Sequence, residues 1–88
     1  MQKKIRAFIL NSFLFSNDEL LLEDGDSLLE RGILDSTGVL ELVAFLEEEF
    51  GAIVADDELV PENLDSVSNI LAFLERKSAS HQHSPFRA

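Results

Sequence analysis

Residues 32–50 read GILDSTGVLELVAFLEEEF, and a helical pattern begins within this stretch. The polar pair Asp35-Ser36 precedes the pattern. Both residue types are favoured at helix N-termini because their side-chain oxygens accept hydrogen bonds from unpaired backbone N–H groups. Gly51 follows the last apolar residue, Phe50, and glycine commonly ends a helix. The stretch therefore predicts a helix over residues 36–50.

A rotation of 100° per residue gives this helix two distinct faces. One face is an apolar stripe, formed by Val39, Leu42, Val43, Leu46 and Phe50. The opposite surface is acidic and carries Thr37, Glu41, Ala44 and Glu48, with Leu40 and Glu47 on one shoulder; Leu40 and Ala44 form a small apolar spot within it. The pattern indicates a helix that packs on a core and exposes an acidic surface.

A second helical pattern covers residues 3–15, where Ile5, Phe8, Ile9 and Phe13 recur at helical spacing. Lys3, Lys4 and Arg6 stand at the N-terminal end of this pattern, which is unfavourable for cations in the field of the helix dipole. The sequence offers no structural reason for these three bases.

Residues 16–35 read as a long connection with turn signals at 16–17 and 24–26. It contains too many leucines for a free loop, so we expect some of them to pin it to the core. Acids at 56–58 predict a short helix over residues 56–60, ended by Pro61.

The last helix follows Asp65 or Ser66, either of which is a suitable cap. Its apolar stripe comprises Val67, Ile70, Leu71 and Leu74. Residues 78–88 are polar and read as a disordered tail after a domain of residues 1–77. The sequence therefore predicts an all-α fold, a small four-helix bundle of three longer helices and one short helix.

Eighty-eight residues allow one small domain. The net charge is −10, and residues 18–65 hold sixteen acids against one base, Arg31. Such a surface repels phosphate backbones, which disfavours nucleic acid as a partner, and it attracts basic protein surfaces. A solvated face that only keeps the chain soluble is the alternative interpretation.

The chain has no cysteine, which excludes disulfides, thiolate metal sites and a cysteine nucleophile. No apolar run approaches the roughly 20 residues that span a bilayer. The basic start is not followed by a small-residue cleavage site, so a secretory signal is not expected. These features predict a cytoplasmic protein without a membrane span.

Three catalytic or metal-binding patterns are unsupported. Asp24 and Asp26 hint at a calcium loop, but Leu29 stands where such a loop needs glycine. His81 and His83 lie in the predicted tail, where two imidazoles alone make a weak metal site. Ser36 has no histidine in reach by any pattern, so a Ser-His-Asp hydrolase is not indicated. We expect no metal site and no catalytic residue.

Residues 32–50 resemble the modification site and second helix of the acyl carrier protein family, which includes thiolation domains and D-alanyl carriers. Three landmarks in order carry the resemblance: the approach at 26–32, the Asp35-Ser36 pair with the acids at 47–49 before Phe50, and the Leu-Asp-Ser-Val sequence at 64–67. It covers about residues 3–77. Thr37 and Gly38 depart from the family pattern, in which leucine usually follows the serine.

The resemblance implies a four-helix fold and a non-enzymatic carrier. The Ser36 hydroxyl would hold 4′-phosphopantetheine, whose phosphodiester would sit at the positive end of helix 36–50. The arm would carry acyl or aminoacyl groups as thioesters. Asp35 would help present the serine to a phosphopantetheinyl transferase. Loading and processing enzymes with basic surfaces would bind the residues Thr37, Leu40, Glu41, Ala44, Glu47 and Glu48.

Three alternatives remain open from the sequence. The carrier could serve fatty acid, lipid or secondary-metabolite biosynthesis. It could instead be a dedicated aminoacyl or peptidyl carrier, which Thr37-Gly38 and the residues at 64–67 favour slightly. The third alternative is an acidic helical interaction module with an unmodified Ser36 that acts only as a helix cap. A monomer is expected in each case.

Overall fold

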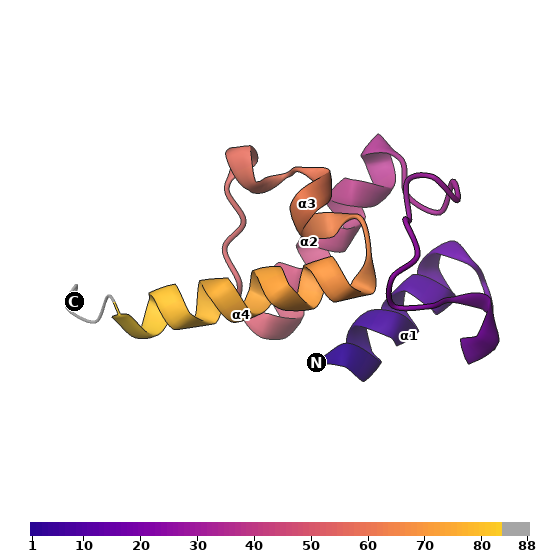
Figure 1. Cartoon of the computed structure of the whole chain (residues 1–88), viewed down its shortest axis with the longest axis horizontal. Coiled ribbons are helices and arrows are strands. Elements are labelled where there is room, and N and C mark those ends of the chain that lie inside the picture. The colour runs from indigo at the N-terminus through magenta and orange to yellow at the C-terminus, as the bar shows by residue number, and fades with distance from the viewer. Residues whose placement is uncertain (84–88) are drawn as a thin grey trace.

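The computed structural model describes the backbone of residues 1–83 and the side chains of residues 1–77. This part of the chain contains four α-helices and no strand (Figure 1). The helices are α1 (Gln2–Phe13), α2 (Ser36–Phe50), α3 (Pro61–Leu64) and α4 (Val67–His83), and two 3₁₀ turns are η1 (Glu19–Leu21) and η2 (Asp56–Glu58). The predicted all-α class, with three longer helices and one short one, is confirmed.

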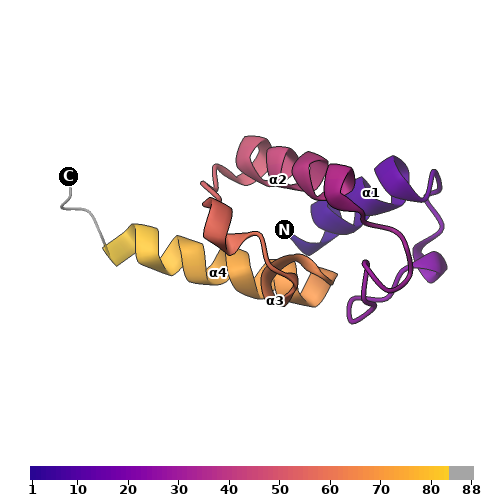
Figure 2. The same ribbon diagram turned by 90° about the horizontal axis from the view of Figure 1, so that it is seen from above.

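The helices pack as two neighbouring pairs around one core. α1 packs on α2, where the rings of Phe8 and Phe45 stack with centroids 4.1 Å apart, and α3 packs on α4 (Figure 2). α1 also contacts α4, which joins the two pairs. The buried apolar residues are Ile5, Ile9, Leu10, Leu22, Leu28, Leu34, Leu42, Leu46, Leu64, Val67, Ile70, Phe73 and Leu74.

The connection between α1 and α2, residues 14–35, is pinned to the core as expected. Leu22, Leu28 and Leu34 are buried, whereas Leu20 is 90% exposed. Three anchors in a long connection leave little freedom for it to move away from the bundle, because each anchor removes apolar surface from water.

α2 has the predicted bounds. The carboxylate of Asp35 accepts a hydrogen bond from the Gly38 N–H at 2.7 Å, and Gly51 ends the helix in the left-handed region with φ of 69°. Leu42 and Leu46 are buried while Glu41 and Glu48 are exposed, so the two predicted faces are confirmed.

The prediction of a short helix over 56–60 is wrong. Only Asp56–Glu58 form a 3₁₀ turn, and Pro61 begins α3 instead of ending a helix. Proline suits the first helical position because its fixed φ is already helical and no N–H is needed there. A proline after an acidic turn is therefore compatible with the start of the next helix as well as with the end of the preceding one.

Two helix ends also differ from the sequence prediction. α1 ends at Phe13 and not at residue 15, because Phe15 adopts a φ of 52°, outside the right-handed helical region. α4 continues to His83, so the first six residues of the predicted disordered tail, 78–83, are helical. Residues 84–88 lie outside the described residues, and the division of the chain at residue 77 stays a prediction.

The start of α4 distinguishes the two candidate caps. The hydroxyl of Ser66 accepts a hydrogen bond from the Asn69 N–H at 3.0 Å, so Ser66 caps the helix. Asp65 makes other contacts, described below. Within residues 1–83, no helix has the length and apolar composition that crossing a membrane requires.

Candidate functional site

Ser36 is the first residue of α2, and its side chain is exposed. The capping position belongs to Asp35, whose carboxylate binds the Gly38 N–H. Ser36 is therefore not the helix cap, and the interpretation of its hydroxyl as a purely structural cap does not hold. The capping by Asp35 leaves that hydroxyl at the surface, where another molecule can reach it.

The surroundings of Ser36 fit a phosphodiester. The N–H groups of Ser36 and Thr37 belong to the first turn of α2, which has no carbonyl partners of its own for them. These groups and the helix dipole favour an anion at this end. Ser36 and Thr37 are both exposed, so no side chain has to move to admit the group.

Gly38 allows close packing beneath the serine. A Cβ atom at this position would lie 3.2 Å from Cδ2 of Leu34 and 3.2 Å from Cε1 of Phe13. Both distances are shorter than ordinary carbon contacts, which begin at about 3.5 Å. The departure from the family pattern at Gly38 thus has a structural reason: it lets the end of α1 pack against the first turn of α2.

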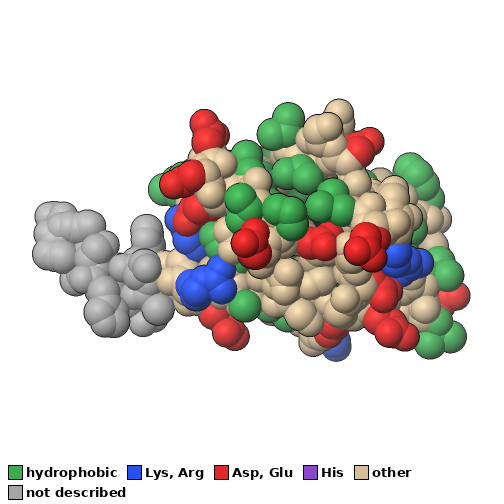
Figure 3. Space-filling model, turned by 45° about the horizontal axis from the view of Figure 1, so that its top comes forward, with side chains coloured by type: hydrophobic (Ala, Val, Ile, Leu, Met, Phe, Trp, Pro, Cys, Tyr) green, Lys and Arg blue, Asp and Glu red, His purple; other side chains and the backbone are tan. Residues whose placement is uncertain are grey.

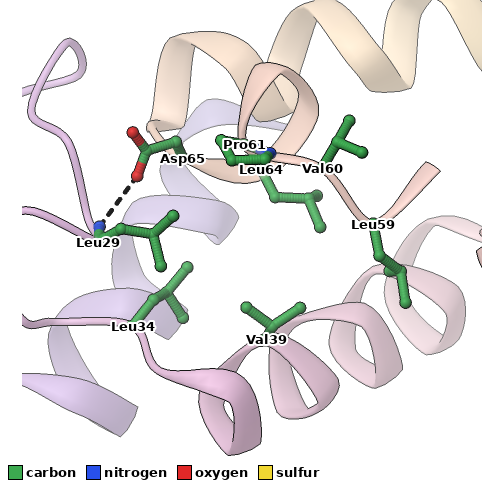
Figure 4. A pocket seen from close by; sticks show the side chains of 8 residues that line it. All are labelled: Leu29, Leu34, Val39, Leu59, Val60, Pro61, Leu64 and Asp65. Carbon is green, nitrogen blue, oxygen red and sulfur yellow. Dashed lines mark hydrogen bonds between the residues drawn. The ribbon is translucent and has the colours of Figure 1, made fainter. Parts of the chain in front are cut away.

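A small apolar hollow opens beside the start of α2 (Figure 4). Its volume is about 80 Å³, and its side chains come from the connection, α2, the segment after η2, and α3. The lining residues are Leu29, Leu34, Val39, Leu59, Val60, Pro61, Leu64 and Asp65. The hollow lies one turn along α2 from Ser36, since Val39 on its wall is three residues away.

Asp65 fixes one edge of this hollow. Its Oδ1 accepts from the Leu29 N–H at 2.9 Å, and its Oδ2 accepts from the Ser27 hydroxyl at 2.7 Å. Its carbonyl accepts from the Leu28 N–H at 2.6 Å. Asp65 thereby ties the approach to Ser36 to the junction of α3 and α4. Sequence reasoning considered Asp65 as a possible cap and as part of the landmark at 64–67, but not these contacts, because the partners are 36 to 38 residues away in the chain.

Comparison with known proteins gives one informative match. No protein-family model matches the chain. The chain is 34% identical over 64 residues to the D-alanyl carrier protein of Abiotrophia defectiva, and the match covers 72% of this chain and 81% of that protein. The chain belongs to the acyl and aminoacyl carrier protein family. The resemblance found in the sequence is thus confirmed, and the chain is a carrier protein.

The outer surface of α2 in this carrier carries the six residues predicted to bind partners, which are Thr37, Leu40, Glu41, Ala44, Glu47 and Glu48. All six are exposed, and Leu40 is 62% exposed. Glu47 also has a structural contact, because its Oε2 accepts from the Val54 N–H at 3.1 Å. Figure 3 shows the side of the molecule on which α3 and α4 lie, where apolar side chains are also bordered by acidic ones. The role of the six α2 residues in partner binding stays a prediction.

Arg6 is one of the three bases near the chain start that sequence reasoning left unexplained. Its guanidinium binds Glu19 Oε1 at 2.9 Å, Asp24 Oδ1 at 2.6 Å and the Leu22 carbonyl at 2.7 Å. The hydrogen bond to Glu19, against the opposing effect of burial and with the further help of Asp24, raises the pKa of Arg6. Its place at the wrong end of the helix dipole is offset by these contacts.

No group of three or more potential metal ligands occurs in the described part of the carrier. Asp24 binds Arg6, and Asp26 binds Nη1 of Arg31 at 2.7 Å, so both acids of the apparent calcium loop have structural partners. The side chains of His81 and His83 lie outside those that the structure describes.

Proposed function

We propose that this carrier holds a small acyl or aminoacyl group as a thioester on a 4′-phosphopantetheine arm attached to Oγ of Ser36. The observation that supports the attachment point is that the cap of α2 and the exposed hydroxyl belong to two different residues. Asp35 caps the helix, and Ser36 is exposed beside the unpaired N–H groups. The arm would supply the reactive thiol, which the cysteine-free chain lacks.

An aminoacyl cargo of the D-alanyl type is the better supported of the two cargo classes. The relative is named a D-alanyl carrier protein. The hollow beside Ser36 measures about 80 Å³, which is smaller than an engineered cavity of about 150 Å³ that admits benzene. A long fatty acyl chain would enter only if α2 and α3 moved apart. The fatty acid pathway is therefore the second candidate, supported only by the apolar lining of the hollow.

The proposed partners follow from the same site. A phosphopantetheinyl transferase would approach the exposed Ser36 with the help of Asp35. Enzymes that load or use the cargo would bind the acidic surface of α2 through basic residues, with Leu40 and Ala44 as the desolvated centre, because rim charges alone add little affinity. The cytoplasmic location and the monomeric state stay predictions.

The test of attachment is a mass measurement. Incubation with coenzyme A and a broad-specificity phosphopantetheinyl transferase should add the mass of one phosphopantetheine, and Ser36→Ala should abolish the addition. Ser68→Ala, which changes an exposed serine on α4, is the matched control and should be modified normally. An unchanged mass with several transferases, or modification that persists in Ser36→Ala, would contradict the proposal and favour the unmodified interaction module.

The cargo requires a separate measurement. The carrier should be purified from its native cell under conditions that preserve thioesters, and the mass beyond the arm should be determined. We expect a small amino acid, with alanine as the first candidate. A long acyl chain on the arm would contradict the aminoacyl assignment and leave the attachment at Ser36 intact.

A further inference from the structure

Asp65 accepts hydrogen bonds from three consecutive residues of the connection between α1 and α2. Its carboxylate accepts from the Ser27 hydroxyl at 2.7 Å and from the Leu29 N–H at 2.9 Å (Figure 4). Its carbonyl accepts from the Leu28 N–H at 2.6 Å. The stretch from this point to the start of α2 is referred to as the 27–34 loop. One residue at the junction of α3 and α4 therefore holds the beginning of that loop.

The 27–34 loop depends on hydrogen bonds for its order. The Leu28 carbonyl accepts from the Ile33 N–H at 2.8 Å and from the Leu34 N–H at 3.1 Å. Leu28 and Leu34 are buried, whereas residues 29–32 are exposed. A loop with few buried side chains opens at a low cost in free energy unless other contacts hold it. The bonds to Asp65 are such contacts.

Leu34 connects the loop to the serine. It stands two positions before Ser36, and its Cδ2 would lie 3.2 Å from a Cβ atom at Gly38. The Leu34 side chain therefore lies against the turn that carries Ser36. A continuous path of contacts runs from Asp65 through Leu28 and Leu34 to the first turn of α2.

Asp24 is a similar anchor in the first half of the connection. Its carboxylate binds Nη1 of Arg6 at 2.6 Å, and its carbonyl accepts from the Ser68 N–H at 2.9 Å. Among the described residues, Asp24 makes no hydrogen bond to the 27–34 loop. Both aspartates thus tie the connection to the helices, and they differ in whether the contacts continue to the serine.

We propose that Asp65 is a positioning residue for the modification of Ser36, an inference that rests on the proposed function. By holding the 27–34 loop, Asp65 keeps the first turn of α2, and with it the serine hydroxyl, in one place. Asp65 does this through Leu28 and Leu34, without touching either substrate.

The reaction makes this placement important. Oγ of Ser36 forms a bond to the phosphorus of the phosphopantetheine half of coenzyme A, and the bond from that phosphorus to the anhydride oxygen breaks. Adenosine 3′,5′-bisphosphate leaves, and the hydroxyl proton passes to a base of the transferase. Misplacement of a reacting atom by about 1 Å can cost on the order of 100-fold in rate. A serine on a loosened turn should therefore react more slowly.

Removal of the carboxylate should loosen the loop without unfolding the chain. Leu29 is exposed and Ser27 is half-buried, so water can bond to the two donors that Asp65→Ala releases. The bond from Leu28 to the carbonyl at position 65 remains, and Ser66 still caps α4. Asp65→Asn should restore both contacts, because its amide oxygen can accept from the Leu29 N–H while its NH₂ group donates to the Ser27 hydroxyl.

The experiment uses the full chain without its arm, coenzyme A and a broad-specificity phosphopantetheinyl transferase. Initial rates over a range of carrier concentrations give kcat and KM for the unaltered chain, Asp65→Ala, Asp65→Asn and the matched control Asp24→Ala. Thermal melts establish that each protein is folded at the assay temperature. Amide hydrogen exchange at Ile33 and Leu34, followed by NMR, measures the opening of the loop.

We expect kcat of Asp65→Ala to fall roughly tenfold. KM should not change, because the outer surface of α2 is intact, and exchange at Leu34 should become faster. Asp65→Asn should behave as the unaltered chain in both measurements. Asp24→Ala should lower the melting temperature and leave both kcat and the exchange at Leu34 unchanged. A purely structural role would not distinguish the two aspartates in this way.

An unchanged kcat in Asp65→Ala, or an equal fall in Asp24→Ala, would overturn the positioning role and leave the proposed function standing. A higher KM with unchanged kcat would also overturn it, because the loop would then be a contact surface for the enzyme. An equal fall in Asp65→Asn would overturn it in favour of an effect of charge.

If Asp65→Ala is not folded at the assay temperature, Ser27→Ala takes its place, since it removes one of the same contacts. It should also lower kcat, and an unchanged kcat in this variant would overturn the positioning role. An unaltered chain that is not modified at all would overturn both proposals.

Discussion

Two acidic regions of this carrier use their charges differently. In the connection between α1 and α2, Glu19 and Asp24 bind Arg6 and Asp26 binds Arg31. On the outer face of α2, neither Glu41 nor Glu48 has a basic partner among the described side chains. The acids of the connection hold it to α1 and to itself through ion pairs. The acids on the outer face of α2 have no such pair, so their charge is available to another molecule. Two regions that are both rich in acids therefore have different roles.

The largest effect should come from removing the cation of the first region. Arg6→Met removes the guanidinium that donates to the carboxylates of Glu19 and Asp24 and to the carbonyls of Glu19 and Leu22, and the Arg6 side chain is only 13% exposed. Hydrogen bonds to charged groups contribute about 1.5–3 kcal/mol, so we expect a loss of about 2 kcal/mol in the free energy of unfolding. Urea denaturation measures it.

Lys4→Met is the control for this change, because the pair of Lys4 with Glu49 is exposed and should contribute about 0.5 kcal/mol or less. Arg6→Lys should fall between the two, since an ammonium cannot reproduce the fork of the guanidinium. Equal losses in Arg6→Met and Lys4→Met would show that the two regions do not differ as described.

Charge reversal in the second region should affect partners and not the fold. Glu41→Lys with Glu48→Lys should change the free energy of unfolding by no more than about 0.5 kcal/mol. It should slow association with the loading enzyme by roughly tenfold at low salt, and by less as salt is added. Stopped-flow association rates at several NaCl concentrations provide the measurement.

Glu75→Lys on α4 controls for a charge reversal away from α2, because it lies at an exposed position of a different helix. It should reduce the association rate far less than the double reversal. If the double variant associates normally at low salt, the outer face of α2 is only a solvated surface.

Salt should raise the melting temperature of the unaltered chain near neutral pH. The unpaired acids repel one another, and added NaCl or millimolar Mg²⁺ screens that repulsion. A gain on the order of 1 kcal/mol corresponds to about 4–8 °C for a domain of this size. The rise should be larger in Arg6→Met, because the acids of the connection then join the repulsion. A flat response in both proteins would mean that the charges are already compensated.

The smallest effect concerns Glu58. The backbone N–H of Ala55, and then Lys77 at 2.9 Å, lower the pKa of Glu58 below its ordinary value of 4.5. The unfolded chain therefore binds the proton more readily, so the stabilisation is present above pH 4.5 and is lost as pH falls through the lowered pKa. Glu58→Gln should be less stable than the unaltered chain at pH 7, and the difference should shrink in urea titrations near pH 3. A constant difference would contradict the assignment.

The sequence was sufficient where the signal is local. The cap Asp35, the stop Gly51 and the apolar stripe through Leu42 and Leu46 define α2 within seventeen consecutive positions, so its bounds and its faces follow from spacing alone. Ser36 was found for the same reason, as the residue beside the cap. A turn signal such as Pro61 was ambiguous, because proline fits a helix start as well as the end of a preceding element.

Only the tertiary structure decided the contacts that join distant positions. The sequence identified Ser36, its helix and the acidic surface, because helical periodicity and capping act within a few residues. It could not reveal that Arg6 binds the acids of the connection, that Asp65 holds the approach to Ser36, or that Gly38 admits Phe13. Each of these contacts joins residues that are brought together when the common core is buried. The residues in contact lie up to 38 positions apart, so the local spacing of the sequence does not indicate them.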